Sequence, residues 1–273
     1  MTDGDEVPAL PGYIDIGHQY SRAPIIEATI DLRVDSGDTG APLVDEEHFA
    51  KLSQIYSSGD AGFEAPTPLY TFSSKLTVDD GDTIVGRAPG RQIGFTFRKQ
   101  DGSAVIRANI DRYAYTRLTP YTDWDDFLKD AEASWTLYRD AVSPSQVVTV
   151  GVRFVNRIVV PKTIIEIRDY LRATVDVPPY LPQWTTGYFL QVGIPLEEFD
   201  AEALVITALG DREEGEEDCT ILILDIDVRS QVRLDVSGDN FDAALLAKLA
   251  KLRVAKNFVF EACITDATRG LLG

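Results

Sequence analysis

The chain has little of the chemistry on which common enzyme families depend. Its 273 residues include only two cysteines and two histidines. Cys219 and Cys263 form no Cys-x-x-Cys motif and lie beside no histidine, so no zinc-site pattern is present. His18 and His48 are far apart in sequence, and an ordinary surface or hydrogen-bonded role is the favoured interpretation of each. P-loop, GxGxxG, HExxH and GxSxG motifs are absent, which excludes the common nucleotide-binding, zinc-protease and serine-hydrolase signatures.

Long hydrophobic runs are also missing. No apolar run approaches the roughly 18 residues that a membrane helix needs. The first residues, Met1–Pro8, are acidic, whereas a signal peptide begins with a basic and then an apolar segment. The two cysteines lie in apolar, strand-like segments, where they fit small core residues of a protein in a reducing compartment. We therefore expect a cytoplasmic protein without membrane contact.

Basic residues are outnumbered throughout most of the chain. The 26 Lys and Arg residues against 44 Asp and Glu give a net charge of −18, so nucleic-acid binding is not expected. The segment from Arg87 to Arg117 is an exception, because its seven basic residues outnumber its two acids. Two interpretations stay open. These arginines form a contact for an anion or another subunit, or, as we favour, they are solvated strand residues paired with acids of neighbouring strands.

The hydrophobic pattern predicts strands and helices in a defined order. Alternation of apolar and polar residues predicts strands at 25–34, 69–78, 91–99, 104–118, 147–160, 185–195, 203–209 and 219–229. Helical spacing predicts helices at 44–56, 122–142, 162–174 and 239–254, and residues 257–264 fit a final strand or short helix. Thr122 followed by Asp125 resembles a capping box for the long middle helix.

This order of elements runs twice. Each pass contains a strand, a short helix, three strands and a long helix, with a break near residues 142–146. We predict an α+β fold with a mainly antiparallel sheet, helices on one side, and two pseudo-repeated halves. The predicted division is a loose N-terminal lead-in at 1–22, a first half at 23–143, and a second half at 144–273 packed on the first.

Five short landmarks, in this order, resemble one known family. They are Pro24–Ala28, the residues Tyr121, Trp124 and Phe127, the stretch Arg153–Ile158 with Pro161, Asp225–Asp227, and Phe260–Thr265. The chain thereby resembles the sporadically distributed prokaryotic family of uncharacterised proteins, over about residues 22 to 268. Arg107 departs from that pattern, because an uncharged polar residue is expected there in many relatives. The resemblance implies a bacterial or archaeal cytoplasmic setting and, through the family's patchy distribution, an association with defence or conflict systems. It implies no activity and no catalytic residues.

The candidate functional surface is the sheet face turned away from the helices. Strand parity places on it charged residues that include Arg153, Arg157, Asp225, Asp227, Glu27 and Arg107. Asp225 and Asp227 are two residues apart and point the same way, so they hold a divalent cation, share acid–base work, or each pair with an arginine, which is the favoured interpretation. Arg153 and Arg157 form a candidate clamp for a phosphate or carboxylate.

Three functions remain open on this reading. We expect first a non-enzymatic protein-binding module, which uses the charged face or a sheet edge to engage a partner or a second copy. The alternative is a protein or enzyme that binds a small anionic ligand at a polar site between the halves. Nucleic-acid binding by the basic strands ranks last. No cofactor and no metal are expected.

Overall fold

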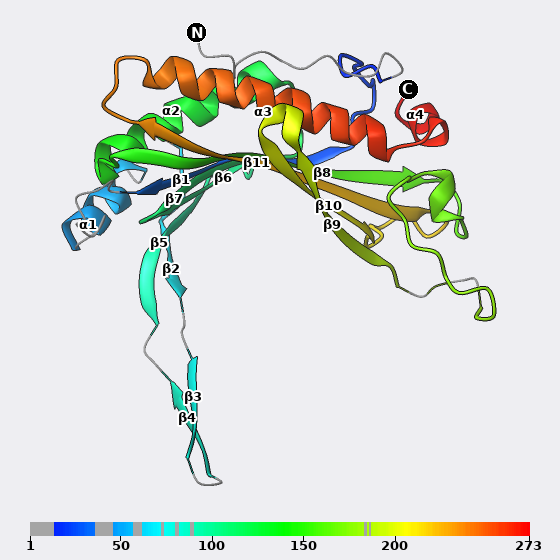
Figure 1. Cartoon of the computed structure of the whole chain (residues 1–273), viewed down its shortest axis with the longest axis horizontal. Coiled ribbons are helices and arrows are strands. Elements are labelled where there is room, and N and C mark those ends of the chain that lie inside the picture. The colour runs from blue at the N-terminus through cyan, green and yellow to red at the C-terminus, as the bar shows by residue number, and fades with distance from the viewer. Residues whose placement is uncertain are drawn as a thin grey trace.

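A nine-stranded antiparallel sheet forms the body of the molecule, in the order β2-β5-β6-β7-β1-β8-β11-β10-β9 (Figure 1). The computed structural model describes residues 14–35, 46–56, 62–71, 74–79, 82–87, 90–182, 185 and 187–273. Within these residues the predicted α+β class with a mainly antiparallel sheet is confirmed. A separate two-stranded sheet pairs β3 with β4.

The first half of the chain contains seven strands and two helices within the described residues. The strands are β1 (Ile25–Asp35), β2 (Thr67–Thr71), β3 (Ser74–Asp79), β4 (Asp82–Arg87), β5 (Arg91–Arg98), β6 (Ala104–Asn109) and β7 (Arg112–Leu118). The helices are α1 (Glu46–Ile55) and α2 (Trp124–Val142). Asp45 precedes α1 and is of a residue type favoured at N-caps, but it lies outside the described residues.

The second half contains β8 (Gln146–Val160), β9 (Phe189–Leu196), β10 (Ala201–Leu209) and β11 (Thr220–Asp235). Its helices are α3 (Phe241–Cys263) and α4 (Asp266–Leu272), with short 3-10 turns η2 (Ile167–Asp169) and η3 (Glu197–Phe199). The first strand of each half, β1 and β8, pair at the centre of the sheet. Moving outward, β7, β6 and β5 on one side correspond to β11, β10 and β9 on the other. The predicted division at residues 143 and 144 thus falls inside one continuous sheet.

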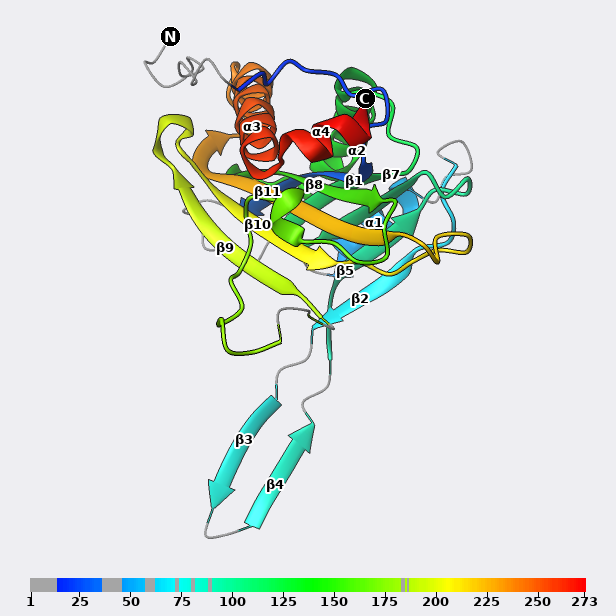
Figure 2. The same ribbon diagram turned by 90° about the vertical axis from the view of Figure 1, so that its right-hand side faces the viewer.

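Helices α2 and α3 lie across the same face of this sheet (Figures 1 and 2). The buried side of α2 includes Trp124, Phe127, Trp135 and Tyr138, which pack in the same core as the inward residues of the strands. This apolar stripe recurs at helical spacing and removes aromatic surface from water, which stabilises the layered arrangement. The helix begins one residue later than the capping-box pattern suggested, because the Asp123 side chain accepts a hydrogen bond from the Asp126 backbone N–H at 2.9 Å.

The prediction of a single strand at 104–118 is wrong, because these residues form a hairpin of two strands, β6 and β7. The chain turns between Asn109 and Arg112, and β6 then pairs with β7. Asn and Asp are favoured in such turns. Here the turn is also fixed by neighbouring strands, since Ile110 N donates to Ile93 O at 2.8 Å and Val34 N donates to Asp111 O at 3.0 Å.

Three other predicted boundaries also differ. The helix predicted at 162–174 reduces to η2, because its β-branched residues are poor helix formers and Thr220 Oγ1 donates at 2.7 Å to the carbonyl of Lys162. The strand predicted at 69–78 is divided between β2 and β3. Residues 257–264 continue the preceding helix, so that α3 runs unbroken from Phe241 to Cys263.

Candidate functional site

The face of the sheet opposite α2 and α3, hereafter the open face, carries all six of the predicted site residues. Strand register places Glu27, Arg107, Arg153, Arg157, Asp225 and Asp227 on this face, because their cross-strand partners alternate with the buried core positions. The hairpin β3–β4 and the loop at residues 174–182 both project beyond the open face, at opposite ends of it (Figures 1 and 2). The open face is therefore flanked by two projections.

A groove of about 330 Å³ crosses the open face where the two halves meet. Five arginines and three acids line it, together with small and polar residues from β1, β5, β6, β7, β8 and β11. We call it the arginine groove; its charged residues are Arg98, Arg107, Arg112, Arg153, Arg229, Glu27, Asp31 and Asp227. The groove is locally basic in a chain whose net charge is −18. Four of the six predicted site residues, Glu27, Arg107, Arg153 and Asp227, belong to this one groove.

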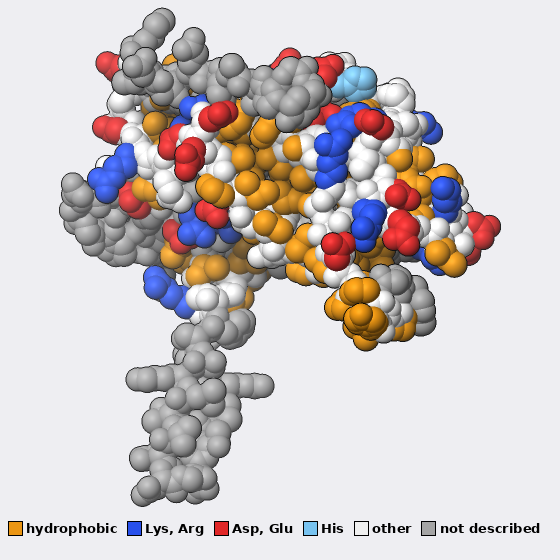
Figure 3. All heavy atoms as spheres, turned by 45° about the vertical axis from the view of Figure 1, so that its right-hand side comes forward, with side chains coloured by type: hydrophobic (Ala, Val, Ile, Leu, Met, Phe, Trp, Pro, Cys, Tyr) orange, Lys and Arg blue, Asp and Glu red, His pale blue; other side chains and the backbone are white. Residues whose placement is uncertain are grey.

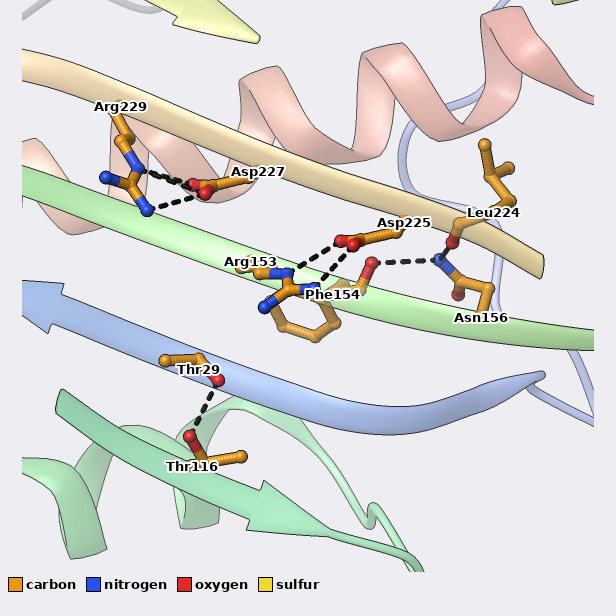
Figure 4. A network of polar contacts seen from close by, with 9 residues as sticks. All are labelled: Thr29, Thr116, Arg153, Phe154, Asn156, Leu224, Asp225, Asp227 and Arg229. Atoms are coloured by element: carbon orange, nitrogen blue, oxygen red, sulfur yellow. Dashed lines mark hydrogen bonds and ion pairs between the residues drawn. The ribbon is translucent and has the colours of Figure 1, made fainter. Parts of the chain in front are cut away.

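Ala114, Thr29 and Thr116 are small residues that line the groove. In one row across the strands, Arg107 is followed by Ala114, Asp31, Gly151 and Arg229. Gly151 allows a close approach here, since a Cβ on it would lie only 3.1 Å from Arg229 Cγ. In the next row the hydroxyls of Thr29 and Thr116 are hydrogen-bonded at 2.8 Å (Figure 4). Arg107 and Arg229 therefore lie at the two ends of the first row.

Three of the arginines are held by carboxylates. Arg153 donates to Asp225 at 2.8 and 2.6 Å, and Arg229 donates to Asp227 at 2.9 and 2.7 Å (Figure 4). These two-point pairs fix the guanidinium planes. The hydrogen bonds to Asp225 raise the pKa of Arg153 against the opposing effect of burial, and those to Asp227 act in the same way on the pKa of Arg229.

The third held arginine is Arg112, whose Nε donates to Asp31 at 2.7 Å. Asp31 is only 6% exposed, although it lies on the open face, because Arg112 covers it. Two of these pairs, Arg153 with Asp225 and Arg112 with Asp31, join neighbouring strands as the favoured interpretation expected, whereas Arg229 and Asp227 lie on the same strand, β11.

Arg98 and Arg107 differ from the other arginines of the groove. Both side chains are exposed, and neither makes an ion pair or side-chain hydrogen bond with any residue in the described ranges. They are diagonal neighbours on β5 and β6, since Thr96 pairs with Arg107 and Arg98 pairs with Val105. Glu27 is also without a hydrogen bond from a described side chain, and its negative charge contributes to the raised pKa of Arg153. Two adjacent, unneutralised guanidinium groups therefore form one side of the groove.

Arg157 lies outside the groove and is held by the acidic loop between β10 and β11. Its Nη1 donates to Glu216 Oε1 at 2.9 Å, and Glu213 lies within 3.6 Å. Hydrogen bonding by Arg157 lowers the pKa of Glu216 to about 2. Arg153 and Arg157 thus each have their own carboxylate, and the structure does not bring them together as the predicted clamp.

The predicted Asp225 and Asp227 pair is likewise divided between Arg153 and Arg229 (Figure 4). In the described part of the chain, His, Cys, Asp and Glu side chains do not gather in groups of three that could hold a metal ion.

Both cysteines are free thiols, and burial raises the pKa of Cys263 to about 11. Across the same residues, no helix is both long enough and apolar enough to cross a membrane.

Sequence reasoning omitted Arg229 and undervalued Arg98. The signal for Arg229 was present, because it follows Asp227 by two residues on one strand and therefore shares its face.

No family model matches the chain, and no curated protein is similar to it in sequence.

Proposed function

We propose that this protein is a non-enzymatic binding protein that holds an acidic segment of a partner protein in the arginine groove. The observation that carries the proposal is the pair Arg98 and Arg107, which are exposed and unneutralised among the described residues, beside arginines that are each held by an acid. A guanidinium group matches a carboxylate in a planar, two-point geometry, which favours this class of ligand.

Fixed walls support binding in this groove. The ion pairs of Arg153 and Arg229 restrict their side chains before any ligand arrives, so less conformational entropy is lost on binding. Each of these ion pairs uses Nε and Nη2 of its arginine, so Nη1 of Arg153 and of Arg229 is left to donate to a ligand. Arg98 and Arg107 supply the unneutralised charge. The groove thus has fixed arginine donors on one side, Arg153 and Arg229, and net positive charge on the other, from Arg98 and Arg107.

The shape of the open face favours an extended protein segment. The groove crosses several strands, and the projections at either end of the open face bound a longer surface (Figure 1). The loop at 174–182 exposes apolar side chains, with Tyr180 fully exposed and Leu181 at 56%. Figure 3 shows hydrophobic side chains gathered at the tip of this loop. An acidic segment flanked by apolar residues fits both surfaces.

The arginine groove is basic although the whole chain is acidic, and this contrast predicts how the affinity for an acidic partner depends on salt. The attraction is local, because the rest of the chain repels an acidic partner. Screening by salt weakens the contacts in the groove and the long-range repulsion together. We therefore expect a moderate loss of affinity with salt, in contrast to the steep loss typical of nucleic-acid binding.

The test uses a fluorescein-labelled oligoglutamate peptide and fluorescence anisotropy. The variant Arg98→Gln/Arg107→Gln should weaken binding at least about tenfold, since each lost charged contact contributes on the order of 1 kcal/mol. Arg33→Gln is the matched control, because Arg33 is an exposed arginine of β1 on the same open face but outside the groove. Equal binding by the double variant and the wild type would reject the proposal.

A small anionic ligand is the second candidate. It is favoured by the volume of the groove, about 330 Å³, which lies at the lower end of the range for small-molecule sites. Citrate and inorganic phosphate test it through saturable thermal stabilisation that the double variant loses. If citrate is bound tightly and oligoglutamate is not, the small ligand replaces the protein segment as the proposed occupant.

A sheet edge is a further route to a partner or a second copy. β9 ends the sheet within the described residues, and its Phe189 side chain is 67% exposed. Sedimentation velocity of wild type and Phe189→Glu tests self-association at this edge, and a monomer at all concentrations excludes it. Membership of the sporadically distributed prokaryotic family, with its cytoplasmic and defence-related setting, is a proposal that rests on the sequence landmarks alone.

A further inference from the structure

A second pocket lies on the helix side of the sheet, opposite the arginine groove. Its volume is about 260 Å³, it opens to solvent, and it is lined by the N-terminal segment at 16–25, the start of α2, β8 and α3. Aromatic residues form much of its wall, among them Tyr121, Trp124 and Phe154. Two cations of α3, Arg253 and Lys256, also line it. We call it the lysine pocket.

The two cations stand on the faces of two neighbouring aromatic rings. The Lys256 Nζ atom is 3.9 Å from the centre of the Phe154 ring, and the Arg253 guanidinium carbon is 5.3 Å from that of Trp124. These rings are stacked, with centroids 6.5 Å apart. Residues three apart on a helix share a face, so both charges point into the same space. Cation–π contacts orient them but leave their charge uncompensated.

The acidic groups of the pocket are already engaged. Asp123 caps α2 by accepting from the Asp126 backbone N–H. Glu261 accepts from the Tyr20 hydroxyl at 2.7 Å and from Arg269 Nε at 3.0 Å. Among the described residues, neither Arg253 nor Lys256 makes an ion pair. Two like charges thus face one cavity without a carboxylate between them.

The surroundings disfavour a charged amine at this position. Burial, and secondarily the positive charge of Arg253, lower the pKa of Lys256 to about 7. The groups around the pocket therefore disfavour a second positive charge on Lys256 near neutral pH. A bound anion would reverse this effect, because it neutralises Arg253 and attracts the proton to Lys256.

We propose that the lysine pocket binds a small molecule through its carboxylate or phosphate group, which lies between Arg253 and Lys256 while the aromatic wall holds the remainder. Arginine provides two parallel donors and lysine a point charge, the combination that suits a single oxyanion. Rings on the wall supply the apolar contact that small-molecule sites need. This site is independent of the arginine groove, since it lies on the other face of the sheet and uses none of the same residues.

Acetate and inorganic phosphate are the probes, with chloride at equal ionic strength as the reference. Thermal unfolding and calorimetry of the full chain should show saturable binding of at least one probe. Lys256→Met and Arg253→Gln should each weaken it at least about tenfold, the effect of removing one charged contact of about 1.5 kcal/mol. Lys248→Met is the matched control, because Lys248 is on the same helix but pairs with Asp200 at 3.2 Å.

The pH profile of the wild type is a second test that needs no variant in the two cations. Acetate remains charged over the whole range from about pH 6 to pH 8.5, so the affinity of the pocket for acetate should fall across this range as Lys256 loses its proton. The other titratable or charged groups at the pocket are His18, Tyr20, Tyr121, Asp123, Glu261 and Arg253. His18 also lines the pocket, so the same measurement is made on His18→Gln, in which the fall should persist.

A preference for acetate identifies a carboxylate ligand, and a preference for phosphate identifies a phosphorylated one; either supports the proposal. The proposal is overturned if neither probe binds better than chloride. It is also overturned if Lys248→Met loses binding as fully as Lys256→Met, or if acetate affinity does not change with pH.

Discussion

The ion pair between Arg153 and Asp225 gives a quantitative test of how the open face is held. Asp225 is 5% exposed and lies in an apolar row, with Val155 and Ile206 as its cross-strand partners. Arg153 supplies two hydrogen bonds to it, at 2.8 and 2.6 Å. Replacing Arg153 by Met leaves a nearly buried carboxylate without its partner. Such a loss costs about 3–5 kcal/mol in a fully buried pair. Because the Arg153 side chain is 45% exposed, water replaces part of it, and we expect about 2 kcal/mol.

Replacing the acid of this pair should lower the free energy of unfolding much less than replacing the arginine. Asp225→Val places an apolar residue in an apolar row and leaves Arg153 in contact with solvent, so we expect a cost below about 1 kcal/mol. Adding Asp225→Val to Arg153→Met should then restore most of the lost stability, with a coupling energy of about 1.5–2 kcal/mol. Urea unfolding followed by tryptophan fluorescence measures all four proteins. If Arg153→Met is as stable as Asp225→Val, or if the second substitution gives no rescue, the pair does not hold this face as described.

Two further predictions follow from other contacts. Gly94→Ala should destabilise the protein by about 2–3 kcal/mol in urea unfolding, because the added Cβ would lie 2.2 Å from the Ala108 carbonyl oxygen and must push the β5–β6 backbone apart. The control is Gly270→Ala, whose Cβ meets no atom within 4 Å and which should be neutral or stabilising. Equal effects of the two substitutions would contradict the packing described for Gly94. The carboxyl signal of Glu216 should titrate near pH 2 in NMR spectra, so that its ion pair stabilises the fold above the usual Glu range near pH 4.5 and is lost as pH falls toward 2. In Arg157→Gln the midpoint should return toward 4.5, and an unchanged midpoint would show that the pair does not lower it.

Much of the fold was predictable because one period dominates each strand. The alternation in 25–34 and 147–160 defined the central strands β1 and β8, since a buried face leaves a clear signal. The sequence carried a signal for the hairpin within 104–118 that the prediction of one strand overlooked. The apolar alternation of Ile106, Ala108 and Ile110 breaks at Asp111 and Arg112 and resumes with Tyr113 and Tyr115 in the opposite parity, and the hydrogen bonds to Ile93 and Val34 show that the chain turns there. Residues 257–264 were ambiguous because α3 is covered on more than one side, which removes its polar stripe; Asn257, for example, donates to Ile16 O at 3.0 Å.

The candidate site was predictable as a face but not as a set of contacts. Parity sufficed to place Glu27, Arg107 and Asp227 together on the open face. It could not show that Arg153 selects the diagonal Asp225 while Asp227 pairs with Arg229, because that choice depends on side-chain geometry. The lysine pocket was not predictable from the sequence, since Lys256 meets Phe154 and Arg253 meets Trp124 only through tertiary packing around α3.

The most direct test of the proposed function is NMR observation of the arginine Nε–H groups during titration with oligoglutamate. Arginine side chains give separate signals that shift when the guanidinium binds a carboxylate. The signals of Arg98 and Arg107 should shift progressively and saturate with one binding curve, while that of Arg33 on the same face should stay in place. Movement of all three to the same extent, or of none, would contradict a specific acidic segment in the arginine groove.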